Sequence, residues 1–348
     1  MQPANSGVAE EVHFFHNVIL MPIITVISLF VLALLIWIIL RYNKKANPVP
    51  RKFSHNTLIE VIWTGIPILI LLVIALPSFE LLFKEDVTPD GKQVVAVGDG
   101  QTVNFVFDND FPARRMVERG GHLQVIIDDG AEQRTLKRRA DYGVEGFGEA
   151  EIVVSFDQPP APGERVIIRG GRSKDSRGDI VMAPTMTLKA TGKQWSWVHN
   201  YPDFGDFEVF SQMATEDQTT KELYRLEVDN RIVVPVGETI RLTTTADDVI
   251  HAWAMPAFAV KIDAVPGRIN ETWFKADREG VFYGQCSEIC GVRHSFMPIG
   301  IEVVSRPAFE AWIDSQRELA GMAPMFDTNE MKLAQGSVDA DAADAEQE

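Results

Sequence analysis

The sequence contains little cysteine and is short of positive charge. Only two of its 348 residues are cysteine, which excludes the small disulfide-stapled domains of many secreted proteins. Lys and Arg number 33 against 49 Asp and Glu, giving a formal net charge of −16. Such a chain repels phosphate groups, so nucleic acid is excluded as a partner and basic proteins are favoured. Apolar residues make up 46%, which excludes disorder along the whole chain.

Charged side chains are absent from residues 18–40, a run of 23 residues. A helix needs about 20 apolar residues to cross a bilayer. A buried core helix or a signal peptide could also contain such a run. Signal peptides begin with basic residues, whereas Glu10 and Glu11 but no Lys or Arg precede this run. We therefore expect a membrane span here.

A second apolar run covers about residues 61–83 and contains Pro67 and Pro77. Membrane helices tolerate internal proline better than soluble helices do. Residues 41–57, in the loop between the two runs, include five Lys and Arg and no acid, a composition that keeps short loops in the cytoplasm. The sequence thus predicts a hairpin of two spans in a lipid bilayer, with residues 1–17 and everything after residue 83 outside the cytoplasm.

Alternating apolar and polar residues, separated by Gly, Pro and Asp turns, predict strands beyond the hairpin. We expect a β-rich insert at residues 84–184, an antiparallel sandwich or barrel at 185–305 and a short helix at 306–324. Residues 325–348 contain seven acids and one lysine, which is typical of a disordered tail. The predicted fold class is a two-helix transmembrane hairpin with an all-β extracytoplasmic sandwich or barrel and a β-rich insert.

Four potential metal ligands lie within twelve residues: Cys286, Cys290, His294 and Met297. Thiolates and a thioether combined with imidazole favour copper among the first-row metals. One more ligand is expected from elsewhere in the fold, and His251 follows another predicted strand. Three alternatives remain open: a disulfide, a structural zinc site, or simple packing of His294 and Met297. Neither a disulfide nor a zinc site would account for Met297.

The motifs GQCSEICGVRHSFMP, HAWAMP, DAVPGR, GKQWSW and EVIWTGIP together resemble subunit II of the haem-copper cytochrome c oxidases. The resemblance covers about residues 12–83 and 185–305, but neither the insert nor the tail. It implies a cupredoxin fold that carries a dinuclear copper centre called CuA.

The resemblance also implies a role for each matching residue. Cys286 and Cys290 would bridge both coppers, while His251 and His294 would each bind one. Met297 would be a weak ligand to one copper, and the backbone carbonyl of Glu288 would bind the other. The side chain of Glu288 would help to bind magnesium at the boundary with subunit I, a polar interface that includes Asp263 and Arg268.

Four further residues receive roles outside the copper site. Trp195 would be the point of electron entry, and Asp247 and Asp248 would dock a basic cytochrome c. An ordinary packed tryptophan and solvated acids are the alternatives. Glu60 would mark the cytoplasmic mouth of a proton path into subunit I, or would simply be an interfacial carboxylate that meets water.

The implied function is electron transfer from cytochrome c through CuA to the haems of subunit I, where oxygen is reduced to water with proton pumping. The implied partners are subunit I, other oxidase subunits and cytochrome c. The implied location is a bacterial-type inner membrane, with both termini and the CuA domain in the periplasm. Two other functions compete. Related quinol oxidase subunits lack the copper ligands, all of which occur here, and a tethered copper carrier would not need DAVPGR, Glu60 or Trp195.

Overall fold

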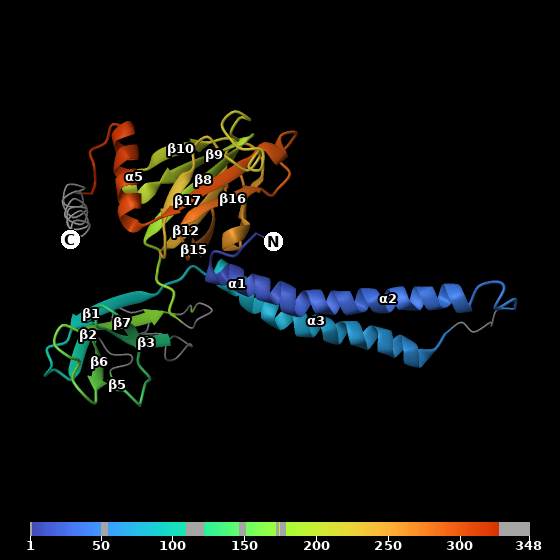
Figure 1. The fold of residues 1–348 in the computed structure, drawn as a ribbon, viewed down its shortest axis with the longest axis horizontal. Helices are drawn as coiled ribbons and strands as arrows, with labels where there is room; N and C mark the ends of the chain where they lie inside the picture. Colours follow the sequence, from blue (N-terminus) through green and yellow to red (C-terminus); the bar gives the residue numbers. More distant parts are fainter. Residues whose placement is uncertain are drawn as a thin grey trace, which may run out of the picture.

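The structure is a computed structural model that describes residues 2–49, 55–108, 122–145, 151–171, 174 and 179–326. A long helical hairpin points away from two separate β units (Figure 1). Five residues of the basic loop, 50–54, lie outside the described residues, as does the acidic tail from residue 327 onward.

The first arm of the hairpin runs from α1 (Gly7–Phe14) through the π-helical η1 (Phe15–Leu20) into α2 (Met21–Arg41). The second arm is α3 (Thr57–Asp86). The mean hydropathy of their most apolar stretches is 3.1 and 2.5. Both arms begin well before the apolar runs because polar residues cap them: Ser6 accepts a hydrogen bond from the Ala9 backbone, and Asn56 accepts one from Ile59.

The insert is a small sandwich of two sheets. Its strands are β1 (Lys92–Val97), β2 (Asn104–Asp108), β3 (His122–Asp128), β4 (Gln133–Thr135), β5 (Tyr142–Glu145), β6 (Glu151–Phe156) and β7 (Arg165–Gly171). Sheet order is β1-β7-β3-β4 in one layer and β2-β6-β5 in the other. Alternate residues such as Val125, Ile152 and Ile168 meet in a core between the layers. Gly91 and Met182 form an isolated β-bridge, so the segments by which the chain enters and leaves the insert lie side by side.

The second β unit packs two five-stranded sheets around a larger core. Its strands are β8 (Met186–Lys193), β9 (Ser196–Tyr201), β10 (Phe207–Ser211), β11 (Ile232–Pro235), β12 (Thr239–Ala246), β13 (His251–Met255), β14 (Val260–Ala264), β15 (Asn270–Lys275), β16 (Gly280–Cys286) and β17 (Pro298–Val304). The short 3-10 turns are η3 (Pro202–Phe204), η4 (Pro256–Phe258) and η5 (His294–Phe296), and α5 (Arg306–Leu319) follows β17. We call this unit, residues 185–305, the cluster domain.

The sheets of the cluster domain are ordered β10-β9-β8-β12-β15 and β11-β17-β16-β13-β14. They are mixed rather than purely antiparallel, because β8 pairs with β12 and β11 with β17 in parallel. Parallel neighbours need long crossover connections. The alternation of apolar and polar residues marks a strand but does not show whether it runs parallel or antiparallel to its neighbours, so the sequence pattern did not reveal the parallel pairs. The fold class predicted from the sequence is confirmed.

Both arms of the hairpin are tied to the cluster domain. The Asn5 backbone donates to Ala257 O at 2.7 Å, and the Ser6 hydroxyl donates to Phe258 O at 3.0 Å. At the end of α3, the Trp273 indole donates to Lys84 O and the Thr272 hydroxyl to Glu85 O, each at 2.9 Å. The domain is therefore held at one end of the hairpin from two sides.

Candidate metal centre

The cysteine loop is closed by the strands that flank it. Cys286 ends β16, and its backbone N–H donates to Met297 O at 3.0 Å, just before β17 begins. Ser287 N–H donates to Ala252 O at 3.0 Å, and Trp253 pairs with Cys286 across β13 and β16. This pairing places His251, the first residue of β13, beside the cysteines although 35 residues separate it from Cys286.

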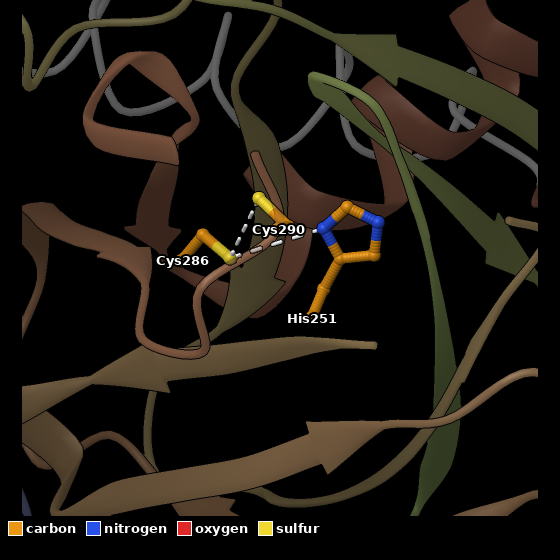
Figure 2. A group of neighbouring side chains, drawn as sticks. All are labelled: His251, Cys286 and Cys290. Atoms are coloured by element: carbon orange, nitrogen blue, oxygen red, sulfur yellow. Dashed lines mark hydrogen bonds between the residues drawn. The ribbon is translucent and has the colours of Figure 1, made fainter. Parts of the chain in front are cut away.

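Two thiols and two imidazoles lie close together. Cys286 Sγ lies 3.9 Å from His251 Nδ1 and 3.8 Å from Cys290 Sγ, and Cys290 Sγ lies 3.6 Å from His294 Nδ1. Figure 2 shows the Cys286 sulfur directed toward both Cys290 and His251. A disulfide needs a sulfur–sulfur bond of about 2.05 Å, so the two cysteines are free.

The spacing of these atoms suits a metal. Tetrahedral ligands at about 2.3 Å for sulfur and 2.0 Å for nitrogen lie about 3.8 Å apart between sulfurs and about 3.5 Å between sulfur and nitrogen. His251, Cys286 and Cys290 are buried, and Met297 is buried in the same core as the cysteines. His294 is partly exposed at the rim. The donor set is therefore soft, enclosed on one side and reachable on the other.

The electrostatics of the thiols also favour a cation. Burial opposes ionisation of Cys286, but hydrogen bonds with His251 and nearby backbone groups lower its pKa to about 6. Burial, together with the negative charge of Cys286, raises the pKa of Cys290 to about 12. A second thiolate is thus costly beside the first, and a metal ion between the two removes that cost.

The predicted docking acids differ in their surroundings. The Asp247 carboxylate is 54% exposed and lies 2.9 Å from Lys193 Nζ. Asp248 turns inward: its Oδ1 lies 2.9 Å from His251 Nε2, and its Oδ2 accepts from the Gln194 backbone at 2.8 Å. Carboxylates in this position orient metal-binding imidazoles.

Trp195 lies against the cysteine loop. A Cβ added to Gly291, which has φ +122°, would stand 3.2 Å from Trp195 Cζ2, so the indole ring is packed on the residue after Cys290. The sequence placed Trp195 in this motif, but gave no reason to single out its neighbour Gln194, which donates to Cys290 O at 2.7 Å. Gly192 is similarly close to the His251 ring, 2.8 Å from an added Cβ. Gly192 and Gln194 both belong to the GKQWSW motif.

Among the remaining predicted residues, only the Glu288 carbonyl contacts a thiol. The Glu288 carbonyl accepts from Cys286 Sγ at 3.4 Å, while its side chain, like those of Asp263 and Arg268, is exposed. Glu60 is at the opposite end of α3, where its carboxylate accepts from the Asn56 backbone at 3.3 Å. It also lines a shallow groove with Val61 and Thr64. Its observed contacts are those of a helix-capping carboxylate.

A two-helix hairpin that carries an extracytoplasmic β domain with a Cys/His cluster defines a membrane-anchored metal-binding protein. Residues 186–304 match the family "Cytochrome C oxidase subunit II, periplasmic domain", and residues 1–81 match the corresponding transmembrane domain. The chain belongs to the cytochrome c oxidase subunit II family, whose members are subunits of haem-copper oxidases. The family and the cluster together indicate a copper site.

Individual relatives agree with the family assignment. The chain is 36% identical over 320 residues to "Probable cytochrome c oxidase subunit 2" of Rickettsia bellii (strain RML369-C), covering 92% of this chain and 84% of the relative. It is 30% identical over 345 residues to "Cytochrome c oxidase subunit 2" of Cereibacter sphaeroides, covering 93% and 83%. It is also similar to the solved periplasmic domain of subunit II of Bradyrhizobium japonicum, at 54% identity, 40% and 97% coverage and a TM-score of 0.38.

Proposed function

We propose that this chain is the electron-entry subunit of its oxidase: it receives electrons from cytochrome c at a dinuclear CuA centre and delivers them to the haems of subunit I. One observation carries the proposal. Two free thiols lie 3.8 Å apart, and each has an imidazole nitrogen within 3.6–3.9 Å of its sulfur. Two shared thiolates between two coppers would let one electron spread over both metals, so little rearrangement accompanies its transfer.

The chain's own residues would hold the ligands still and admit the electron. His251, Cys286, Cys290, His294, Met297 and the Glu288 carbonyl are the proposed ligands. Asp248 fixes the His251 ring through Nε2, so the ring keeps one orientation in both redox states. Trp195, packed on Gly291, is the proposed entry point between a docked cytochrome c and the Cys290 thiolate. Asp247 is the exposed acid that would attract this basic partner.

The proposal extends to the two membrane surfaces. The exposed side chain of Glu288 would help to bind magnesium at the boundary with subunit I. Asp263 and Arg268 would belong to the same polar interface. Glu60, at the other end of α3, would open a proton path that supplies proton pumping in subunit I. The chain would sit in a bacterial-type inner membrane with both termini and the cluster domain in the periplasm, because its basic loop favours the cytoplasm.

Metal analysis and EPR of the purified oxidase test the copper assignment. We expect two coppers per chain in this domain and an EPR signal from one unpaired electron shared by two copper nuclei. One zinc per chain, or a Cys286–Cys290 disulfide in the mature protein, would overturn it.

Flash-induced electron injection separates the entry point from the proton path. Trp195→Phe should slow reduction of the copper centre and leave its spectrum intact. Glu60→Ala should leave that step normal and slow a proton-coupled step in subunit I. Normal injection in the first variant would remove Trp195 as the entry point, and normal turnover in the second would leave Glu60 as a helix cap.

A further inference from the structure

The turn between β8 and β9 touches both loops that carry the proposed copper ligands. Gln194 occupies this turn and makes two hydrogen bonds in different directions. Its side-chain Nε2 donates to Cys290 O at 2.7 Å, and its backbone N–H donates to Asp248 Oδ2 at 2.8 Å. The other oxygen of Asp248 lies 2.9 Å from His251 Nε2. A continuous chain of hydrogen bonds therefore runs from the Cys290 backbone to the His251 imidazole.

The same turn presents the proposed entry tryptophan. A Cβ added to Gly291 would stand 3.1 Å from Gln194 Nε2 and 3.2 Å from Trp195 Cζ2. The amide of Gln194 and the indole of Trp195 thus lie side by side on one glycine, directly after Cys290. Their positions relative to the thiol loop are fixed together.

The cysteine loop needs such support because it is exposed. The side chains of Ile289 and Val292, on either side of Cys290, are 82% and 89% exposed. The strand ladder that fixes Cys286 ends at that residue. Both cysteine side chains are buried in the same core, but Cys290 lies between two solvent-exposed apolar side chains, so the backbone around it is not covered by core packing. A hydrogen bond to the Cys290 carbonyl restrains the loop where core packing does not.

We infer that Gln194 is a positioning residue that locks the Cys290 loop to the turn bearing Trp195 and, through Asp248, to His251. It would hold the entry tryptophan and both ligand loops in fixed positions relative to one another. This restraint would limit movement of the thiolate when the electron arrives. The electron-transfer part of this inference rests on the proposed function. The restraint on the loop does not, because it concerns the protein without copper.

Hydrogen exchange of the full-length chain in detergent, without metal, tests the restraint directly. In Gln194→Ala, peptides that cover residues 287–294 should exchange about fivefold faster, the factor that corresponds to one net hydrogen bond. Gln93→Ala is the matched control, since Gln93 in β1 also makes a side-chain hydrogen bond, accepting from Arg169 Nε at 2.9 Å. It should leave the loop unchanged. Equal exchange in Gln194→Ala and wild type would overturn the inference.

Copper-loaded oxidase provides the second readout. Gln194→Ala should retain two coppers but lose them to a chelator about fivefold faster, with a changed copper hyperfine pattern in EPR. Gln194→Asn keeps the amide but is one methylene shorter, so it should behave like Gln194→Ala and covers the case in which alanine disturbs folding. An unchanged EPR pattern in both variants would count against Gln194 as a positioning residue. A wild-type protein that binds no copper pair would instead reject the proposed function, and the exchange experiment would still decide the role of Gln194.

Discussion

The insert and the cluster domain are both two-layered β units, yet among their described residues only the cluster domain brings potential metal ligands together. The described core of the insert is aliphatic and aromatic, and Asp128 is the one buried acid found among its described residues. The cluster domain buries His199, His251, Asn200 and several threonines within its larger apolar core. Both units are scaffolds of two packed sheets, so the architecture does not distinguish them. The polar groups buried in the cluster domain are what give it a candidate site.

Their loops show the same contrast. In the insert, Asp99 accepts hydrogen bonds from Gln101 N and Thr102 N, which lower its pKa to about 2, and Asp129 binds the backbone of its own turn. The carboxylates and backbone N–H groups of these turns are thus hydrogen-bonded within the turn itself. In the cluster domain, Asp248 accepts a hydrogen bond from Gln194, which lies in a separate loop, and also contacts His251, three residues further along the chain. Residues that depend on distant loops can assemble a site, whereas self-contained turns cannot.

The largest effect is expected from removing a ligand. Cys290→Ser replaces a thiolate with a hydroxyl, which is a poor ligand for a soft metal, so the protein should fail to hold two coppers and should lose the shared-electron EPR signal. Val292→Ala, in the same exposed loop, is the control and should bind copper normally. Retention of both coppers by Cys290→Ser would mean that the metal lies elsewhere and would remove the contrast between the two units.

Matched core truncations test whether the two units are independent. Ile168→Ala in the insert and Ile240→Ala in the cluster domain each remove a fully buried side chain and should cost about 2–5 kcal/mol. Calorimetry and copper analysis should show that only Ile240→Ala lowers the temperature at which copper is released. A single shared unfolding transition that both variants shift equally would show that the insert and the cluster domain fold as one unit.

Acid should weaken the cluster domain through His199. Burial lowers the pKa of His199 from 6.5 to about 3, and its Nε2 accepts from the Trp253 indole at 3.2 Å. Because the unfolded chain binds a proton below pH 6.5 and the folded chain does not, stability is complete above that pH. It falls by about 1.4 kcal/mol per pH unit from there toward pH 3.

His199→Gln keeps an acceptor for Trp253 but does not titrate. In thermal unfolding between pH 7 and pH 5, the free energy of unfolding of wild type relative to this variant should fall by about 1.4 kcal/mol per pH unit below pH 6.5. A constant difference across this range would show that the imidazole takes up its proton in the folded state, and the polar core would then be less enclosed than its burial suggests.

The smallest effect concerns docking. Asp247→Asn should slow association with a basic cytochrome c by about two- to threefold at low salt, and the difference should fade as ionic strength rises. Stopped-flow kinetics would measure this, with Asp157→Asn in the insert as the control for net charge, since Asp157 is also exposed. Equal slowing by both variants would indicate that the overall charge of the protein steers cytochrome c, and that Asp247 is not part of a specific docking site.

Local signals were sufficient to predict the spans, the presence of two β regions and the four ligand candidates in the cysteine loop. Long apolar runs and soft side chains close in sequence are both visible without a fold. The pairing of His251 with the loop came from the family resemblance and from its place after a strand, and the structure brings the residues together. The mixed strand directions were not predicted. Asp248 was predicted as a docking acid for cytochrome c, and its contact with the His251 ring was not foreseen.

The sequence by itself determined which chemistry is available: two long apolar runs to anchor the chain, and two thiols, two imidazoles and a thioether to hold a soft metal. Only the tertiary structure decided which polar groups meet. The Gln194 amide reaches Cys290 O from 96 residues away, and Asp248 closes on His251 while Asp247 faces solvent. The reason is physical, because hydrogen bonds between loops depend on strand register and on which strands become neighbours, and neither is encoded in any local stretch of sequence.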